Sequence, residues 1–200
     1  MKRAGLMAMA ALLLVPAAAF ASTGPAVHPT ASVTVGPGGS AVFDPHSVQV
    51  RLGGAVTWTW ASSGHSVTDD SGFGLFDSGA LGSGATFSYA FQASATHSYA
   101  STPDPGMTGV VRVPIRVHPS TGDERTRFRL TWALAPQPDI YYHVKGRVDG
   151  SRWGTYSDGS DLSFIQVLSD GTWDFKARLV NQNTGAYSAW SPILTIVVTG

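Results

Sequence analysis

The alternation of apolar and polar residues is the feature that most constrains how this chain can fold. From Ser32 onward, apolar side chains recur at every second position in short runs, as at Val56, Trp58 and Trp60. Because successive side chains of a strand point to opposite faces, this pattern predicts strands with one buried face. The runs end at glycine-rich turn segments such as 36–39. The sequence therefore predicts an all-β fold of antiparallel sandwiches, without a helix beyond its N-terminal segment.

The N-terminal segment predicts a secretory signal peptide. Lys2 and Arg3 precede an apolar stretch over residues 4–18, and Ala19-Phe20-Ala21 supplies a small-x-small cleavage site. The apolar stretch is shorter than the roughly 20 residues that a spanning helix needs, and no later segment approaches that length. We therefore expect a signal peptide over residues 1–21 that is cleaved after Ala21. The mature protein is expected to be secreted or to reside in the periplasm or cell envelope, with no integral membrane segment.

The composition excludes several kinds of chemistry. The chain contains no cysteine, which rules out disulfides, thiolate metal sites and cysteine nucleophiles. Without the signal peptide, 11 basic residues face 13 acidic ones. This near balance of charge gives no reason to expect nucleic acid as a partner.

The alternating runs fall into two sets, which predicts two domains. A polar segment, His118-Pro119-Ser120-Thr121-Gly122-Asp123-Glu124, separates them. Domains of roughly 100 residues are large enough to bury a core of their own. We expect an N-terminal extension over 22–31, a first domain over 32–117, a linker over 118–124 and a second domain over 125–200.

The segment from Tyr99 to Gly109 carries the most specific motif of the chain. It reads Tyr-Ala-Ser-Thr-Pro-Asp-Pro-Gly-Met-Thr-Gly. This layout resembles the ligand loop of plastocyanin-like and amicyanin-like cupredoxins, which reads Tyr-x-Cys-x-Pro-His-Pro-x-Met-x-Gly. In this resemblance Ser101 occupies the cysteine position, Asp104 the histidine position and Met107 the position of the axial ligand.

Further landmarks of the same family occur in the expected order. His65, within Gly64-His65-Ser66-Val67, matches the first histidine ligand of the family. Phe43-Asp44-Pro45 and Phe76-Asp77-Ser78-Gly79 match two other positions. The resemblance covers about residues 32–117. It implies a cupredoxin-like Greek-key β-sandwich with a metal site at one end, and for the family it implies copper binding and electron transfer.

The departures from the family pattern predict that the type 1 copper site is degenerate. Such a site needs two imidazoles and a thiolate, with a distant thioether. Ser101 supplies no thiolate, and Asp104 offers a hard anionic oxygen. Two residues after Trp58, where family members usually have an asparagine that holds the ligand loop, the chain has Trp60. Together these changes indicate a site that is no longer used for electron transfer.

The remaining ligand types leave two interpretations open. His65, Asp104 and Met107 could form a residual N,O,S metal site that binds copper at low affinity, with His97 as an additional ligand. Alternatively, His65 is a loop residue kept by hydrogen bonding, Met107 a core side chain and Asp104 a turn residue between two prolines. We favour the second interpretation and therefore expect no cofactor.

The second half of the chain resembles a fibronectin type III domain. Alternating runs at 128–132, 173–179 and 193–198 are followed or joined by tryptophan-containing segments such as Ser188-Ala189-Trp190-Ser191-Pro192. Trp173 occupies the place where such domains often carry the tyrosine of a corner. The resemblance implies a second, immunoglobulin-like β-sandwich, and an immunoglobulin-like sandwich of another kind would give a similar pattern.

Other candidate sites have simpler explanations. Asp69-Asp70 lies near His65 and Ser66, but no glycine-flanked nucleophile accompanies this set, so we do not expect an enzyme. The segments 149–151 and 158–161 offer oxygen ligands without the spacing of a calcium loop, and they are typical of polar turns.

Two further groups of side chains concern surfaces. Arg125, Arg127 and Arg129 form a basic stripe opposite an apolar strand face, which predicts a solvated face or, alternatively, a contact with an acidic polymer. At least half of the aromatic residues of the second domain should be core, and the exposed ones would suit carbohydrate or protein contacts. These aromatic residues are Tyr141, Tyr142, Trp153, Tyr156, Tyr187 and Trp190.

These observations favour a secreted, plastocyanin-like two-domain protein that acts as a non-catalytic binding or structural module. Its partner is expected to be a protein or a glycan of unknown identity. The alternative is a copper-binding electron-transfer protein of the blue-copper family with a rebuilt or weak metal site.

Overall fold

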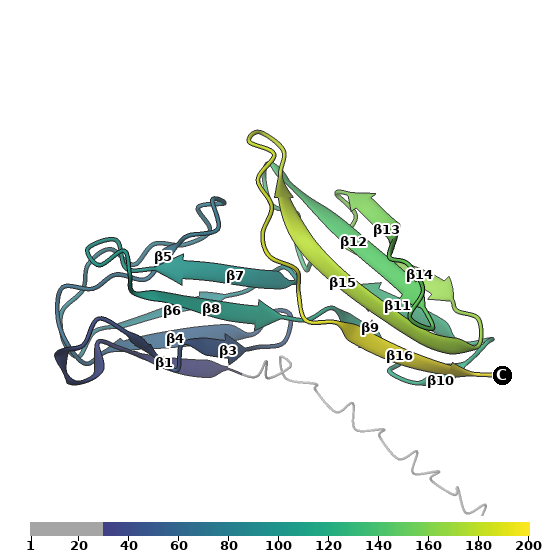
Figure 1. Ribbon diagram of the computed structural model, residues 1–200, viewed down its shortest axis with the longest axis horizontal. Helices are drawn as coiled ribbons and strands as arrows, with labels where there is room; N and C mark the ends of the chain where they lie inside the picture. The colour runs from purple at the N-terminus through teal and green to yellow at the C-terminus, as the bar shows by residue number, and fades with distance from the viewer. Residues whose placement is uncertain (1–29) are drawn as a thin grey trace, which may run out of the picture.

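The computed structural model describes residues 30–200, so the predicted signal peptide and residues 22–29 of the predicted extension lie outside the described part. The described chain is all-β, as predicted, and forms two β-sandwiches (Figure 1). A short 3-10 turn at Pro37–Gly39 is the one helical element of residues 30–200. Within this range, no helix is long and apolar enough to cross a membrane.

The first sandwich consists of two four-stranded sheets. In one sheet the order is β2 (Phe43–Asp44), β1 (Ala31–Val35), β4 (Ala55–Trp60) and β6 (Thr86–Ala90). In the other it is β3 (Ser47–Gln49), β8 (Thr108–Val113), β7 (Ala95–Ala100) and β5 (Thr68–Asp69). The sequence predicted antiparallel sandwiches, and the first sandwich departs from this in two pairs, since β1 pairs with β4, and β3 with β8, in parallel. The chain passes through the opposite sheet between the members of each pair, which lets it return in the same direction.

The core of the first sandwich is built from aromatic rings. Val56, Trp58 and Trp60 of β4 are all buried, as their alternation predicted. The Trp58 ring lies 5.8 Å from that of Phe76 and 5.3 Å, edge-on, from that of Tyr99. Each tilted or edge-to-face pair of this kind stabilises the fold by about 0.5–1.5 kcal/mol beyond the effect of burying its apolar area. Aromatic packing therefore holds the two sheets of this sandwich together.

The second sandwich combines a three-stranded and a five-stranded sheet. In the smaller sheet the order is β14 (Ser163–Val167), β11 (Arg127–Thr131) and β9 (Arg116–His118). In the larger sheet it is β10 (Gly122–Asp123), β16 (Leu194–Thr199), β15 (Gly171–Asn181), β12 (Ile140–Val148) and β13 (Gly154–Gly159). The segment expected as a linker, 118–124, thus contains β10 and the last residue of β9. Both strands pair within the second sandwich, so the chain enters that sandwich at Arg116.

The predicted basic stripe lies on the outer face of the three-stranded sheet. Arg127 and Arg129 are exposed on β11, whereas Phe128 and Leu130 between and after them are fully buried. Arg125, just before the strand, is also exposed. The alternation therefore separated the two faces of this strand correctly.

Main-chain hydrogen bonds join the two sandwiches. The amide of Ser94 donates to the carbonyl of Trp132 over 2.7 Å, and the amide of Thr96 donates to the carbonyl of Ala189 over 3.1 Å. Three residues of the first half also belong to the apolar core of the second sandwich: Ala93, Ala95 and Ile115. The sandwiches are thus in direct contact through backbone and core.

Candidate functional site

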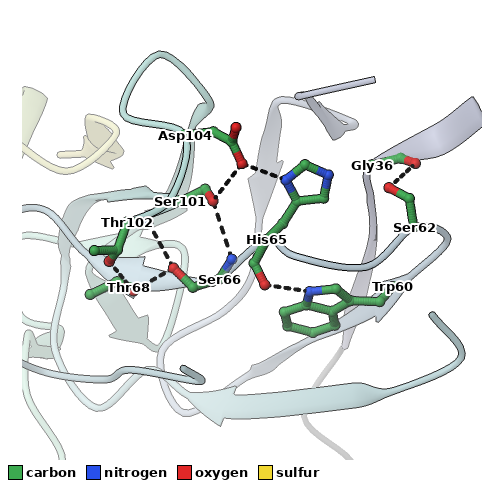
Figure 2. A network of polar contacts seen from close by, with 9 residues as sticks. All are labelled: Gly36, Trp60, Ser62, His65, Ser66, Thr68, Ser101, Thr102 and Asp104. Carbon is green, nitrogen blue, oxygen red and sulfur yellow. Dashed lines mark hydrogen bonds and ion pairs between the residues drawn. The ribbon is translucent and has the colours of Figure 1, made fainter. Parts of the chain in front are cut away.

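Two loops meet at one end of the first sandwich and bring the predicted site residues together. His65 lies in the connection between β4 and β5, and Ser101 and Asp104 lie in the connection between β7 and β8 (Figure 2). Met107 belongs to the same β7–β8 connection. The residue His65 is held by a β-bridge to Leu81. The sequence motif therefore located this end of the sandwich correctly.

His65 and Asp104 contact each other directly. The Nδ1 atom of His65 lies 2.7 Å from Oδ2 of Asp104 (Figure 2). The histidine side chain is 11 % exposed and the carboxylate 38 % exposed. Two ligands of one tetrahedral metal ion, with bonds of about 2.0–2.1 Å, have their donor atoms about 3.3 Å apart. At 2.7 Å the two atoms share a proton, and this contact is a hydrogen bond or ion pair.

Ser101 is fully buried behind this pair and is held by main-chain contacts. Its Oγ accepts a hydrogen bond from the amide of Ser66 over 3.2 Å, and it lies 3.4 Å from Oδ2 of Asp104. The loop closes on itself, because the amide of Met107 donates to the Asp104 carbonyl and that of Ser101 to the Met107 carbonyl. The hydroxyl thus completes the hydrogen bonding of a compact loop.

Met107 belongs to the apolar core of the first sandwich. Its side chain is 1 % exposed and is part of the same cluster as Trp58 and Tyr99. A thioether in such surroundings is a flexible apolar side chain that fills space. The burial of Met107 is therefore explained by packing.

Trp60 holds the loop that carries His65. Its indole Nε1 donates a hydrogen bond to the carbonyl of His65 over 2.8 Å (Figure 2). In the sequence, Trp60 stands out only as the residue at the position of a family asparagine. The structure shows that this buried tryptophan holds the loop of His65 in place, a contact that its position at the end of an alternating run does not reveal.

Gly36 and Ser62 form the far wall of the His65 ring, and the sequence analysis did not identify either. Gly36 has a φ of +66°, and a Cβ there would lie 2.8 Å from Cδ2 of His65 and 2.0 Å from Oγ of Ser62. The Ser62 hydroxyl donates to the carbonyl of Gly36 over 2.8 Å (Figure 2). The left-handed conformation and the close approach both require glycine. The Gly36-Pro37-Gly38-Gly39 turn was visible in the sequence, but its closeness to His65 was not.

Tyr99 and Gly109, the first and last residues of the motif, pack against each other. A Cβ on Gly109 would lie 2.4 Å from Cζ of Tyr99, which stands opposite it in the β7–β8 pair. The Tyr99 ring fills the space above Gly109 and packs 4.7 Å from the ring of Phe43. Burial raises the pKa of Tyr99 to about 12, so its hydroxyl is neutral. The Tyr99 ring and Gly109 are therefore packed together in the core at the base of the loop.

His97 does not belong to this site, so the suggestion that it supplies a further ligand was wrong. It precedes Ser101 by four residues on an extended chain, which corresponds to about 13 Å. Its ring lies 4.9 Å from that of Phe91, and its Nε2 contacts the carbonyl of Ala93 over 3.0 Å. Complete burial lowers the pKa of His97, which favours the neutral ring.

The acidic and hydroxyl residues near His65 organise turns. The Asp69 carboxylate accepts hydrogen bonds from the amides of Ser71 and Leu75. Oγ of Ser66 accepts from the amide of Thr102 over 2.8 Å. These contacts leave Asp104, and not Asp69, as the partner of His65. Within residues 30–200, no three histidine, aspartate or glutamate side chains are grouped so as to hold a metal ion.

The donor set of this site does not fit a type 1 copper ion. The position that needs a thiolate carries the hydroxyl of Ser101, which has no anionic sulfur to share with copper. The imidazole nitrogen Nδ1 of His65 is engaged by a carboxylate. What the arrangement provides chemically is a buried histidine paired with a partly exposed carboxylate and supported by Trp60 and Ser101.

Comparison with known proteins gives neighbours among solved structures. No protein-family model matches the chain, and no curated protein matches it. The chain is similar to a purple cupredoxin from Nitrosopumilus maritimus, with 23 % identity over 42 % of this chain and 98 % of that one, at a TM-score of 0.37. It is similar to a reduced Cu(I) form of an amicyanin variant, with 24 % identity, 42 % and 81 % coverage and a TM-score of 0.38.

A third neighbour is a copper-containing nitrite reductase from Thermus scotoductus. The identity is 21 %, the coverage 42 % of this chain and 22 % of that one, and the TM-score 0.37. The structural neighbours thus include a purple cupredoxin and an amicyanin, and each of the three matches covers about two fifths of the present chain.

Proposed function

We propose that the protein is an exported, non-catalytic binding or structural module whose cupredoxin-like domain has lost the type 1 copper site. The observation that carries this proposal is the 2.7 Å contact between Nδ1 of His65 and Oδ2 of Asp104. These are the two positions at which the resemblance implies histidine ligands. A proton joins them in this geometry, and this hydrogen bond or ion pair accounts for both side chains without a metal ion.

The surroundings of the pair support the same proposal. Ser101, at the thiolate position, satisfies the amide of Ser66, and Met107 lies within the apolar core. Trp60 holds the His65 carbonyl with a contact that suits a structural loop. All the former ligand positions therefore have structural roles in holding this end of the sandwich.

The second domain is proposed to be fibronectin type III-like. Its three-stranded and five-stranded sheets fit an immunoglobulin-like sandwich. Trp173 takes the position of the corner tyrosine, and its Nε1 donates to the carbonyl of Ser169, four residues upstream, over 3.0 Å. This hydrogen bond from a ring to the backbone a few residues upstream is what the corner tyrosine makes in such domains, so it supports a fibronectin type III-like domain.

Restoring the missing ligands tests the proposal. The native chain and the double variant Ser101→Cys with Asp104→His are titrated with Cu(II) and Cu(I), followed by calorimetry and visible absorption. We expect no binding above background for the native chain. The double variant is expected to bind copper and develop the intense absorption of a copper–thiolate bond.

Two single variants serve as controls for residual binding. Submicromolar copper binding by the native chain that is lost in both His65→Ala and Met107→Ala would contradict the proposal. Such a result would identify a rebuilt metal site. Circular dichroism spectra of all variants must match that of the native chain, so that loss of binding reports the ligands and not the fold.

A further inference from the structure

The outer face of β12 and β15 carries a row in which cations alternate with aromatic rings. These two long strands lie side by side in the five-stranded sheet (Figure 1). The cations are on the two strands, and the aromatic rings come from the segments that follow each strand. We name this row the cation–aromatic face; its members are, in order, Arg147, Trp153, Lys176, Trp190, Arg178 and Tyr187.

Each cation of the face is held against at least one ring. Nζ of Lys176 lies 4.2 Å from the ring centre of Trp153 and 4.7 Å from that of Trp190. The Arg178 guanidinium lies 4.5 Å from the centre of Trp190 and 3.8 Å from that of Tyr187. Rings at these distances attract cations and restrict their rotamers. The charged groups are therefore held in fixed places before any ligand arrives, which lowers the entropic cost of binding.

A like-charged pair stands at the centre of the face. Lys145 is directly opposite Lys176 in the β12–β15 register, and its Nζ lies 6.0 Å from the centre of the Trp190 ring. Like charges directly opposite on a sheet destabilise it. Burial lowers the pKa of Lys176, and the nearby charges of Lys145, Arg147 and Arg178 lower it further.

The carboxylates on this face do not neutralise the lysine pair. Asp174 forms an ion pair with Arg147 at 2.9 Å and accepts a hydrogen bond from Thr195. Asp158, at the far edge on β13, is opposite His143. The charge of Lys145 and Lys176 is thus left for a partner outside the chain.

We propose that the cation–aromatic face binds an anionic polysaccharide along β15, with the acidic groups of the sugars on Lys145, Lys176 and Arg178. Side chains two residues apart on one strand are about 6.4–6.8 Å apart. A linear polymer with regularly spaced acidic groups can follow such a row. Tyr187, at the end of the row, is 55 % exposed and offers a ring for contact with a sugar.

The environment predicted for the protein favours a polysaccharide over other polyanions. The N-terminal segment predicts export, and acidic polysaccharides are linear polyanions found outside cells. The chain as a whole has balanced charge, unlike proteins that bind nucleic acid through a basic surface. The inference rests on the proposed role as a binding module, and it names the site and the class of ligand.

Binding to dextran sulfate and to uncharged dextran tests the inference. The two polymers share a sugar backbone and differ in charge. We expect the native chain to bind dextran sulfate and not dextran, with an affinity that falls as salt screens the charges. The variants Lys145→Gln and Lys176→Gln are each expected to weaken binding about tenfold, the loss that one removed charge-assisted contact produces.

Thermal unfolding of the same variants separates binding from a purely structural role. Lys145→Gln removes the repulsion opposite Lys176, so we expect its melting temperature to be unchanged or higher while its affinity falls. A lower melting temperature with unchanged affinity would overturn the inference. The variant pair Arg127→Gln with Arg129→Gln removes two charges from the other sheet, and equal loss of binding in that control would also overturn it.

Further probes distinguish the polysaccharide from other partners. Binding of polyphosphate, single-stranded DNA or anionic vesicles as tight as that of dextran sulfate would overturn the assignment to a polysaccharide. Lack of binding to dextran sulfate would overturn the whole inference. The copper titration tests residues of the first sandwich only, whereas the dextran sulfate assay tests residues of the second. Copper binding by the native chain would therefore contradict the proposed function, and lack of dextran sulfate binding would contradict this inference alone.

Discussion

The two sandwiches differ in where they place their tryptophans: Trp58 and Trp60 of the first are both buried, whereas the second buries Trp132 and carries other tryptophans on an outer face. In the first, rings such as those of Trp58, Phe76 and Phe91 point inward and pack against one another. In the second, Trp153 and Trp190 lie on the outer face and contact cations. The difference follows from position, because Trp58 lies in phase with the buried residues of its strand, whereas Trp153 and Trp190 lie outside strands. A tryptophan can thus be assigned to the core from sequence only where an alternating run fixes its direction.

Replacing one tryptophan from each sandwich tests this comparison with the largest expected effect. Trp58→Ala removes a ring that is 0 % exposed, and we expect it to lower the free energy of unfolding by about 3–5 kcal/mol. Trp153→Ala, with its half-buried ring, should cost about 1 kcal/mol through lost cation–ring contacts. Urea unfolding followed by circular dichroism measures both. Equal losses would show that the two rings do not differ in role.

Adding one methyl group at Gly109 tests how tightly the core of the first sandwich is packed around Tyr99. Gly109→Ala places a Cβ 2.4 Å from the Tyr99 ring, which must shift into a packed core. We expect a loss of about 1–3 kcal/mol in unfolding free energy, the usual range for overpacking. Gly106→Ala is the matched control, because no atom lies within 4 Å of its added Cβ. If both variants were equally stable, the packing of Tyr99 over Gly109 would not constrain this position.

One histidine in each sandwich lies beside an aromatic ring, and the pH dependence of stability compares the two: His97 lies beside Phe91 and His143 beside Trp190. His97 is buried and its pKa is lowered by that burial, so the unfolded chain binds a proton more readily than the folded one. The stabilising contribution is therefore complete above about pH 6.5 and is lost as the pH falls, by at most about 1.4 kcal/mol per pH unit. Melting temperatures between pH 8 and pH 5 measure this loss, and His97→Leu should reduce the slope.

His143, on the outer face, provides the control for that measurement. Partial burial lowers its pKa, and Arg178 and Lys145 add to this effect while Asp158 opposes it. Its ring remains accessible to water, so His143→Asn should change the slope less than His97→Leu does. A larger change for His143→Asn would place the pH-sensitive group in the second sandwich.

The smallest expected effect concerns the site pair. Asp104→Asn keeps the shape of the side chain and removes its charge opposite His65. Since the carboxylate is 38 % exposed, we expect a loss below about 1 kcal/mol at pH 7. Asp174→Asn, which breaks the ion pair with Arg147 in the second sandwich, should have a similar effect. A loss of several kcal/mol for Asp104→Asn would show that the pair is a main support of the first sandwich.

The sequence predicted the strands and one end of the site, and it failed where contacts depend on loops. The phase of Val56, Trp58 and Trp60 predicted burial correctly, since alternation is a local property. The motif from Tyr99 to Gly109 located the loop that faces His65. The contact of Trp60 with the His65 carbonyl depends on how a loop folds back, which no local pattern encodes.

The cation–aromatic face shows the same limit. The positive residues of β12 and β15 alternate within each strand, as in Lys176-Ala177-Arg178, and that pattern is visible in the sequence. Their juxtaposition with Lys145 depends on the pairing register of two strands about 30 residues apart. Such a register is set by the whole sheet and is not readable from one strand.

The hydrogen bonds from Ser94 and Thr96 to the second sandwich have a mechanical consequence. They join main-chain atoms, so exchange of a single side chain does not remove them. Tension applied along the molecule would have to break backbone bonds and open an apolar contact at the same time. A single substitution is therefore not enough to uncouple the two halves of the described chain, because their contact combines main-chain hydrogen bonds with a shared apolar cluster.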